Sequence, residues 1–102
     1  MAIKTFKSKN LKKFWEGNDP SGINPAHVEK ISGMLDLIDA AEKIQDLRPF
    51  YRFHEYTGGG KGVYSFSVSG NCRLLFRFHA GDAFDLWYGD PHGLQIERII
   101  GR

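Results

Sequence analysis

The stretch VYSFSVSGNCRLLFRFHAGDAFDLWY, residues 63–88, decides the fold of this chain. Apolar and polar residues alternate through most of it, and this period of two is typical of strands with one buried face. Turn residues at 69–71 and 80–82 interrupt the alternation. Strands joined by such short connections pair antiparallel, so the stretch predicts a β-meander. Its expected strands are 63–68, 72–79 and 83–88.

The lengths of the two turns predict the register of these strands. Apolar side chains of consecutive strands share a face only if the loop between them has an odd number of residues, a condition that 69–71 and 80–82 meet. The expected pairs on the apolar face are Phe78 with Phe84, Phe76 with Leu86 and Leu74 with Tyr88. On the other face they are Ser67 with Arg73, Arg77 with Asp85, Leu75 with Trp87 and Arg73 with Gly89. One face of the sheet is therefore predicted to be apolar and the other polar.

The residues before the meander predict helices and further strands. Asn10 can cap a short helix that Gly17 ends, and Asn24 followed by Pro25 is typical of a helix start. The expected elements are a strand around 3–6, a helix over 10–17, a helix over 25–42 with one further turn to 47, and a strand at 51–56. We therefore expect an α+β fold in which two N-terminal helices pack on a twisted antiparallel sheet of four to five strands.

Composition narrows the class of protein. The 102 residues, 41% hydrophobic and 14% aromatic, predict one globular domain over 1–102. The single cysteine, Cys72, allows no internal disulfide or zinc cluster and favours a reducing, cytoplasmic location. The longest run without charged residues, 62–72, is far shorter than a membrane helix, and no signal peptide is expected.

The charge of the chain is uneven, although its net value is only +2. Five lysines and no acidic residue lie within the first thirteen positions; they are Lys4, Lys7, Lys9, Lys12 and Lys13. Such a patch keeps a small domain soluble, or it binds nucleic acid. Charge alone leaves both interpretations open.

The histidines differ in their predicted surroundings. His27, in the first turn of the second helix, is expected at the surface or in packing, and His79 is expected to be a solvated strand end. His54 shares the parity of Arg52 and therefore points to the polar face. The fourth histidine, His92, follows Asp90 by two residues, so a turn can bring carboxylate and imidazole together.

The polar face therefore collects groups that metal-free RNA cleavage needs. They are His54, Arg73, Asp90 and His92, with Lys61 in the glycine-rich loop. A 2′-hydroxyl must lose a proton, a pentavalent phosphate needs a cation, and the departing 5′-oxygen needs a proton. The alternative is that these side chains only keep a small sheet hydrated. The run Gly58-Gly59-Gly60-Lys61-Gly62 lacks the spacing of a phosphate-binding loop and predicts a hairpin tip.

Several segments together resemble HigB-type toxins of the RelE/ParE superfamily. They are IKTFKSKNLKKFW at 3–15, IDAA at 38–41, YRFH at 51–54, GVYSFSV at 62–68, GNCRLLFRF at 70–78, GDAFD at 81–85 and Asp-x-His at 90–92. The resemblance covers 1–92. It implies the RelE-like fold and a ribosome-dependent mRNA endonuclease without a cofactor, which the lysine patch would help to hold on the ribosome. It also implies a HigA-type helix-turn-helix antitoxin in a toxin–antitoxin heterotetramer.

The resemblance assigns catalytic positions to His54, Arg73, Asp90 and His92. Two positions depart from the family pattern, because Thr57 replaces a lysine and Pro91 replaces a tyrosine. Lys61 is the candidate to replace the missing cation and contact substrate phosphate. Residues 93–102 form a C-terminal extension, expected to pack as a short helix or strand.

Two further interpretations belong to other functional classes. The departures at Thr57 and Pro91 favour a non-catalytic or decayed relative that binds a protein or the ribosome, as in the gyrase-inhibiting branch of the superfamily. Retention of both candidate catalytic histidines and of Arg73 favours an enzyme. A transcriptional module fits poorly because no recognition-helix motif is present.

Overall fold

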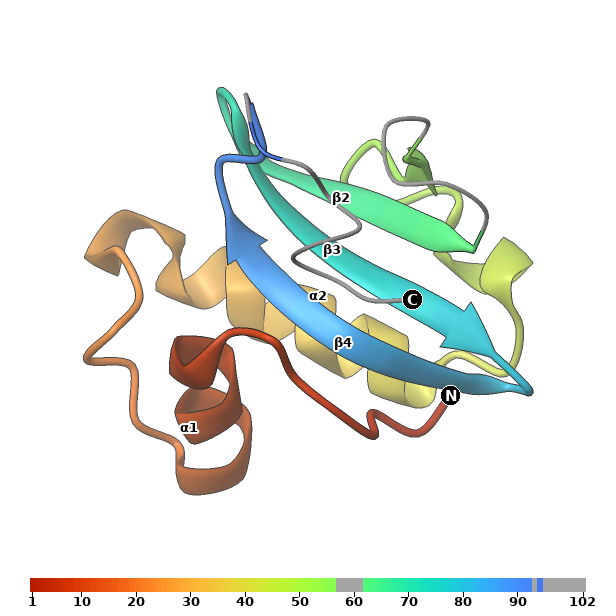
Figure 1. Cartoon of the computed structure of the whole chain (residues 1–102), viewed down its shortest axis with the longest axis horizontal. Coiled ribbons are helices and arrows are strands. Elements are labelled where there is room, and N and C mark those ends of the chain that lie inside the picture. The colour runs from red at the N-terminus through yellow and green to blue at the C-terminus, as the bar shows by residue number, and fades with distance from the viewer. Residues whose placement is uncertain (57–61, 93, 95–102) are drawn as a thin grey trace.

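The computed structural model describes residues 1–56, 62–92 and 94. In chain order the elements are α1 (Lys9–Gly17), the 3-10 turn η1 (Pro25–His27), α2 (Val28–Ala40), the 3-10 turn η2 (Ile44–Leu47), β1 (His54–Glu55), β2 (Val63–Ser69), β3 (Cys72–His79) and β4 (Asp82–Gly89). The strands form one antiparallel sheet in the order β1-β2-β3-β4. Figure 1 shows α2 behind the sheet and α1 beside β4. The α+β fold expected from the sequence is confirmed.

Helix α1 begins one residue earlier than predicted and ends at Gly17 as predicted. Ser8, not Asn10, precedes the first turn, because the Ser8 carbonyl accepts from the Lys12 N–H at 3.1 Å. The Ser8 hydroxyl accepts from the Tyr88 N–H at 2.9 Å, which joins the helix start to β4. The residue that caps this end is Asn18, which follows Gly17 in a left-handed conformation (φ 55°).

Helix α2 starts as predicted and ends earlier. The Asn24 side chain accepts from the Ala26 N–H at 2.9 Å, and Pro25 occupies the first position of η1. The helix stops at Ala40 instead of continuing to residue 42. The expected further turn forms as η2, where the Asp46 carboxylate accepts two backbone N–H groups and its pKa is thereby lowered.

Both expected three-residue turns are two-residue turns. Ser69 pairs with Cys72, and His79 pairs with Asp82. At the second turn Ala80 and Gly81 adopt φ values of 51° and 85°, the left-handed geometry that suits the twist of a tight hairpin.

Each shortened turn shifts the register by one residue. The shift is absorbed by an irregularity between Ser67 and Ser69 on β2 and by a bulge on β4 opposite the segment from Leu75 to Arg77. The pairs Ser67–Arg73, Leu74–Tyr88, Leu75–Trp87 and Arg73–Gly89 are confirmed. The expected alignments Phe78–Phe84 and Arg77–Asp85 are wrong, because Asp85 bulges with φ 57° and Arg77 pairs with Phe84. The expected pair Phe76–Leu86 falls at the register shift between Leu75 and Arg77 and stays a prediction. The expected Arg77–Asp85 ion pair still forms, with Nη1 and Oδ2 3.9 Å apart.

The strand expected at 51–56 shortens to His54–Glu55. Tyr51 and Arg52 adopt φ values of 49° and 53°, which turn the chain away from the sheet. The Tyr51 hydroxyl would lie 2.9 Å from a Cβ at Gly33, so glycine at this position of α2 makes room for the ring. The segment expected as a strand at 3–6 forms two isolated parallel bridges to β4, Ile3 with Ala83 and Phe6 with Leu86.

The core lies between the helices and one face of the sheet. Its largest fully buried side chains on this side are Leu11, Ile31, Met34, Leu35, Ile38, Leu47, Phe66, Leu74, Phe76 and Leu86. The outer face is less polar than expected, because Val63 and Leu75 are buried there with Tyr56 and Trp87 packed against them. Ser65 lies in the same row as Leu75 and is 0% exposed.

Ser65 provides a test of this outer cluster. Its hydroxyl has no hydrogen-bond partner among the residues described. Because a buried hydroxyl without a partner carries a desolvation cost, Ser65→Ala is expected to raise the free energy of unfolding by up to about 1 kcal/mol. Urea denaturation measures this, with Ser67→Ala on the same strand as the control that should show no gain. A loss above about 1 kcal/mol for Ser65→Ala would contradict the prediction.

Candidate functional site

His54 lies on the short edge strand β1 with its side chain exposed to solvent. Its Nδ1 atom is 2.9 Å from the carbonyl oxygen of Arg52. Because a carbonyl oxygen only accepts hydrogen bonds, Nδ1 carries the proton in this contact. In the neutral ring, Nε2 is therefore the unprotonated nitrogen, available to take a proton from a bound molecule.

Arg73 lies on β3, with Ser67 and Gly89 as its cross-strand neighbours. Its Nη1 donates to the carbonyl oxygens of Gly70 and Cys72, at 2.7 and 3.1 Å. These contacts hold one edge of the guanidinium at the β2–β3 turn. A guanidinium has five N–H donors, so others remain to bind an anion.

Asp90 and His92 follow the end of β4 and contact one another as predicted. One oxygen of Asp90 accepts the His92 backbone N–H at 2.9 Å and lies 3.5 Å from the imidazole Nδ1. Both side chains are exposed, with 77% of the His92 side chain accessible. Pro91 between them is buried, which anchors the turn.

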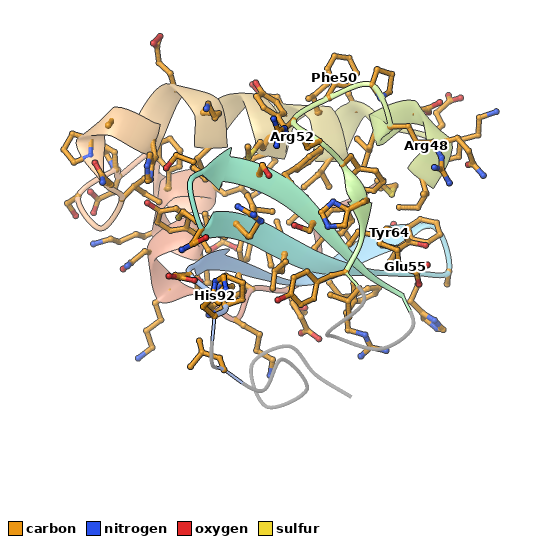
Figure 2. The ribbon with its side chains drawn as sticks, turned by 90° about the horizontal axis from the view of Figure 1, so that it is seen from above. Arg48, Phe50, Arg52, Glu55, Tyr64 and His92 are labelled. Atoms are coloured by element: carbon orange, nitrogen blue, oxygen red, sulfur yellow. The ribbon has the colours of Figure 1, made fainter. Side chains whose placement is uncertain are left out.

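The register places these residues on neighbouring rows of the sheet. His54 pairs with Ser65, in the row that continues through Leu75 and Trp87. Arg73 is two residues further along and two strands across, so its Cα lies about 12 Å from that of His54 by ordinary strand spacing. In Figure 2, His92 lies on the side of the sheet away from α2, whereas Arg52 lies towards α2.

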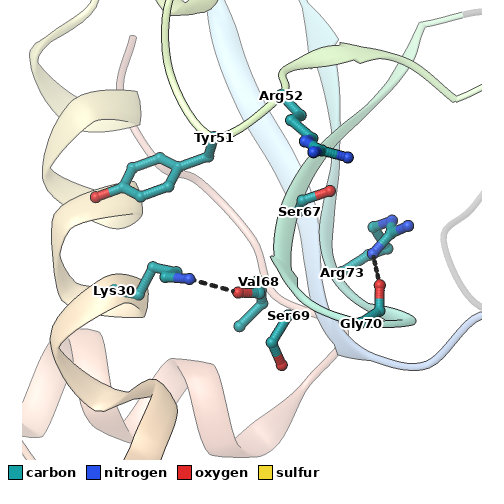
Figure 3. A pocket seen from close by; sticks show the side chains of 8 residues that line it. All are labelled: Lys30, Tyr51, Arg52, Ser67, Val68, Ser69, Gly70 and Arg73. Carbon is teal, nitrogen blue, oxygen red and sulfur yellow. Dashed lines mark hydrogen bonds between the residues drawn. The ribbon is translucent and has the colours of Figure 1, made fainter.

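A pocket of about 430 Å³ opens at this end of the sheet. Its lining residues are Lys30, Tyr51, Arg52, Ser67, Val68, Ser69, Gly70 and Arg73, as Figure 3 shows. Lys30 comes from α2, and its ammonium donates to the Val68 carbonyl at 2.8 Å. Lys30 could not be identified from the sequence, because a contact between residues 38 positions apart has no local signal.

His27 packs between two elements, in agreement with its expected packing role. Its Nδ1 is 2.7 Å from the Tyr88 hydroxyl, and its Nε2 is 2.8 Å from the Ser69 hydroxyl. Cys72 lies nearby, and burial raises the pKa of its thiol. The thiol is therefore protonated at neutral pH and is a poor nucleophile.

The lysines of the first thirteen residues are all exposed; they are Lys4, Lys7, Lys9, Lys12 and Lys13. They lie along β4 and on α1, at the opposite edge of the sheet from β1 (Figure 1). Lys13 is engaged locally, because its ammonium donates to Ser21 at 2.8 Å and lies 3.8 Å from Asp19.

Some predicted residues fall outside the part of the chain that the structure describes. They are Thr57, Lys61 and, apart from Leu94, the extension 93–102. Within 1–56, 62–92 and 94, His, Cys, Asp and Glu side chains form no group of three or more that could hold a metal ion. The helices in these ranges are too short or too polar to cross a membrane.

Fold and surface together define a class of protein: small α+β domains whose imidazole and guanidinium groups suit them to bind and process a phosphodiester backbone. The family model described as "RelE-like toxin of type II toxin-antitoxin system HigB" matches residues 4–92. The chain belongs to this family of HigB-like toxins. It is therefore a toxin of a type II toxin–antitoxin system, and the family implies an antitoxin as its partner.

Two curated relatives match nearly their whole length. Endoribonuclease HigB of Proteus vulgaris is 40% identical over 91 residues, which cover 88% of this chain and 99% of the relative. Toxin HigB-1 of Vibrio cholerae serotype O1 is 36% identical over 90 residues, covering 85% of this chain and 94% of the relative. The resemblance found in the sequence is confirmed.

Proposed function

We propose that this toxin is a ribosome-dependent mRNA endonuclease that stops translation in the cytoplasm and needs no metal. The observation that carries the proposal is the orientation of His54, whose Nδ1–H is held by the Arg52 carbonyl so that Nε2 can act as a base. The name of the Proteus relative, an endoribonuclease, supports the same activity.

The reaction assigns one task to each side chain. His54 Nε2 removes the proton of a 2′-hydroxyl, and the resulting oxygen attacks the adjacent phosphorus. Arg73 stabilises the negative charge of the pentavalent phosphorane. The bond from phosphorus to the 5′-oxygen then breaks, and protonated His92 donates a proton to that oxygen. The products are a 2′,3′-cyclic phosphate and a 5′-hydroxyl.

Asp90 is a positioning residue in this scheme. It accepts the backbone N–H of His92 and lies 3.5 Å from its imidazole, so it holds the ring in one orientation. Pro91 offers neither an aromatic ring nor a hydroxyl to the substrate. In the proposal Lys61 supplies the cation that Thr57 does not, and the exposed lysines near β4 contact ribosomal RNA.

The direct test adds the purified toxin to translating ribosomes and maps the ends of the mRNA. New ends with a cyclic phosphate and a 5′-hydroxyl are expected. The departures at Thr57 and Pro91 favour the competing function, a toxin that inhibits by binding without cutting. Inhibition of translation without new ends would support that function instead.

The antitoxin partner leads to a second prediction. We propose a HigA-type helix-turn-helix protein that forms a heterotetramer with the toxin and docks on the lysine-rich side of β4 and α1. Co-expression with the antitoxin encoded beside the toxin should yield a co-purifying complex of that mass. Lys7→Glu with Lys12→Glu should slow association about tenfold at low salt, because complementary charges steer encounter. Lys43→Glu is the control, and absence of any complex would contradict the prediction.

A further inference from the structure

The pocket between α2 and the edge of β2 holds more positive charge than the proposed cleavage step uses. Arg52, Lys30 and Arg73 line it, and no acidic side chain is among its described lining residues. Only Arg73 has a role in the proposed chemistry. Strand β1 pairs with β2 at Ser65 and Tyr64, and the end of β2 beyond them, at Ser67–Ser69, lines this space. The Ser67 N–H there donates to the Tyr51 carbonyl at 2.8 Å.

The cations of the pocket are positioned by the fold. One N–H of the Lys30 ammonium is taken by the Val68 carbonyl at 2.8 Å, which leaves the others for a ligand. Arg52 is exposed, and its own carbonyl holds the imidazole of His54. Arg52 lines the pocket, and its carbonyl contacts the proposed base His54. A ligand in the pocket therefore lies next to the cleavage site.

A hydroxyl donor faces the same space. Ser69 lines the pocket and contacts His27 Nε2 at 2.8 Å, while His27 Nδ1 contacts the Tyr88 hydroxyl at 2.7 Å. When Tyr88 donates to His27 and His27 donates to Ser69, the Ser69 proton is free to donate into the pocket. Planar guanidinium, ammonium and hydroxyl donors together match the oxygens of a phosphate.

We propose that this pocket binds a phosphate of the mRNA backbone that flanks the scissile phosphate. The inference rests on the proposed endonuclease function and assigns Arg52, Lys30 and Ser69 to substrate binding, where they place the 2′-hydroxyl against His54. The alternative ligand of the pocket is an acidic side chain of a protein partner, and the experiment below distinguishes it from an mRNA phosphate.

The experiment measures toxin binding to ribosomes programmed with an mRNA that has a 2′-deoxynucleotide at the cleavage position. Such an mRNA cannot be cut, so binding is read independently of the proposed chemistry. A neutral methylphosphonate replaces each flanking phosphate in turn. At one flanking position we expect the wild-type toxin to bind about three- to thirtyfold more weakly, the range for one charge-assisted contact partly screened by solvent.

Arg52→Ala and Lys30→Met should each bind the all-phosphate mRNA more weakly by a similar factor and should be insensitive to that methylphosphonate. Arg48→Ala and Lys43→Met are matched controls, because both side chains are exposed outside the pocket and should leave wild-type sensitivity. Thermal melting should show all four variants folded.

The proposal is overturned if the methylphosphonate weakens ribosome binding of the wild type and of Arg52→Ala equally. It is also overturned if a methylphosphonate at neither flanking position weakens binding of the wild type. It is also overturned in favour of a protein ligand if Arg52→Ala binds the ribosome normally but loses its antitoxin. Failure of the endonuclease function gives a different result. If natural mRNA is not cut but the methylphosphonate still weakens binding of the wild-type toxin, the endonuclease function fails and the assignment of the pocket stands.

Discussion

Alanine in place of His54 or His92 is expected to lower the rate of mRNA cleavage by about 10²–10⁴-fold, the usual contribution of a general base or acid. His54 has its Nδ1 proton committed to the Arg52 carbonyl, and His92 contacts Asp90. Both imidazoles are exposed, so the variants should fold and still bind the antitoxin. The measurement is single-turnover cleavage on programmed ribosomes.

The controls for this prediction come from the same chain. His79→Ala removes an exposed imidazole whose ring contact is with Phe84, 6.4 Å away between centroids, and it should cleave normally. The double variant should lose less than the product of the two single losses, because acid and base act in one step. Chelators should have no effect, and the rate should fall on both sides of a pH optimum because one imidazole must be neutral and the other charged.

Growth arrest separates an enzyme from a binding toxin. If the folded double variant still arrests growth and no new mRNA ends appear, the nuclease proposal is falsified and inhibition by binding remains. If arrest disappears together with cleavage while ribosome binding persists, the two histidines act in catalysis.

Arg73→Ala is expected to lower cleavage by about 10²–10³-fold, the effect of removing one preorganised group that stabilises a developing oxyanion. Carbonyl oxygens of Gly70 and Cys72 hold its guanidinium at 2.7 and 3.1 Å, so little reorganisation is needed when charge develops. Single-turnover rates at saturating ribosome concentration should show the loss in kcat.

Arg73→Lys distinguishes geometry from charge. A lysine keeps the charge but lacks the planar fork, so we expect partial recovery to within about tenfold of wild type. Arg48→Ala, at an exposed position outside the pocket, is the matched control and should cleave normally. A loss confined to KM with kcat unchanged would contradict the role of Arg73 in the transition state.

Much of the sheet could be predicted because its signals are local. The alternation through 63–88 and the glycine turns located three strands to within about one residue. The bulge at Asp85 could not be predicted in this way. Its backbone N–H donates to the Thr5 hydroxyl at 2.8 Å, a contact between residues 80 positions apart. The register of β3 with β4 therefore matches the prediction only from Arg73 to Leu75 and shifts by one residue between Leu75 and Arg77.

The candidate site, like the sheet, could be predicted from the sequence only in part. Asp90 and His92 are two residues apart, so their contact could be predicted from the turn, and the parity that placed His54 on the outer face was correct. The tautomer of His54 could not be predicted, because it depends on Arg52, whose left-handed conformation (φ 53°) interrupts the strand.

The sequence by itself determined the antiparallel meander, the helix pair and the identity of the groups on the outer face, because hydrophobic period and turn chemistry act between near neighbours. Only the tertiary structure decided which cations meet. Lys30 and Val68 contact each other because α2 packs behind the sheet, and Arg52 reaches the same pocket because the chain turns at Tyr51. Such contacts depend on how whole elements pack, and no local pattern encodes that packing.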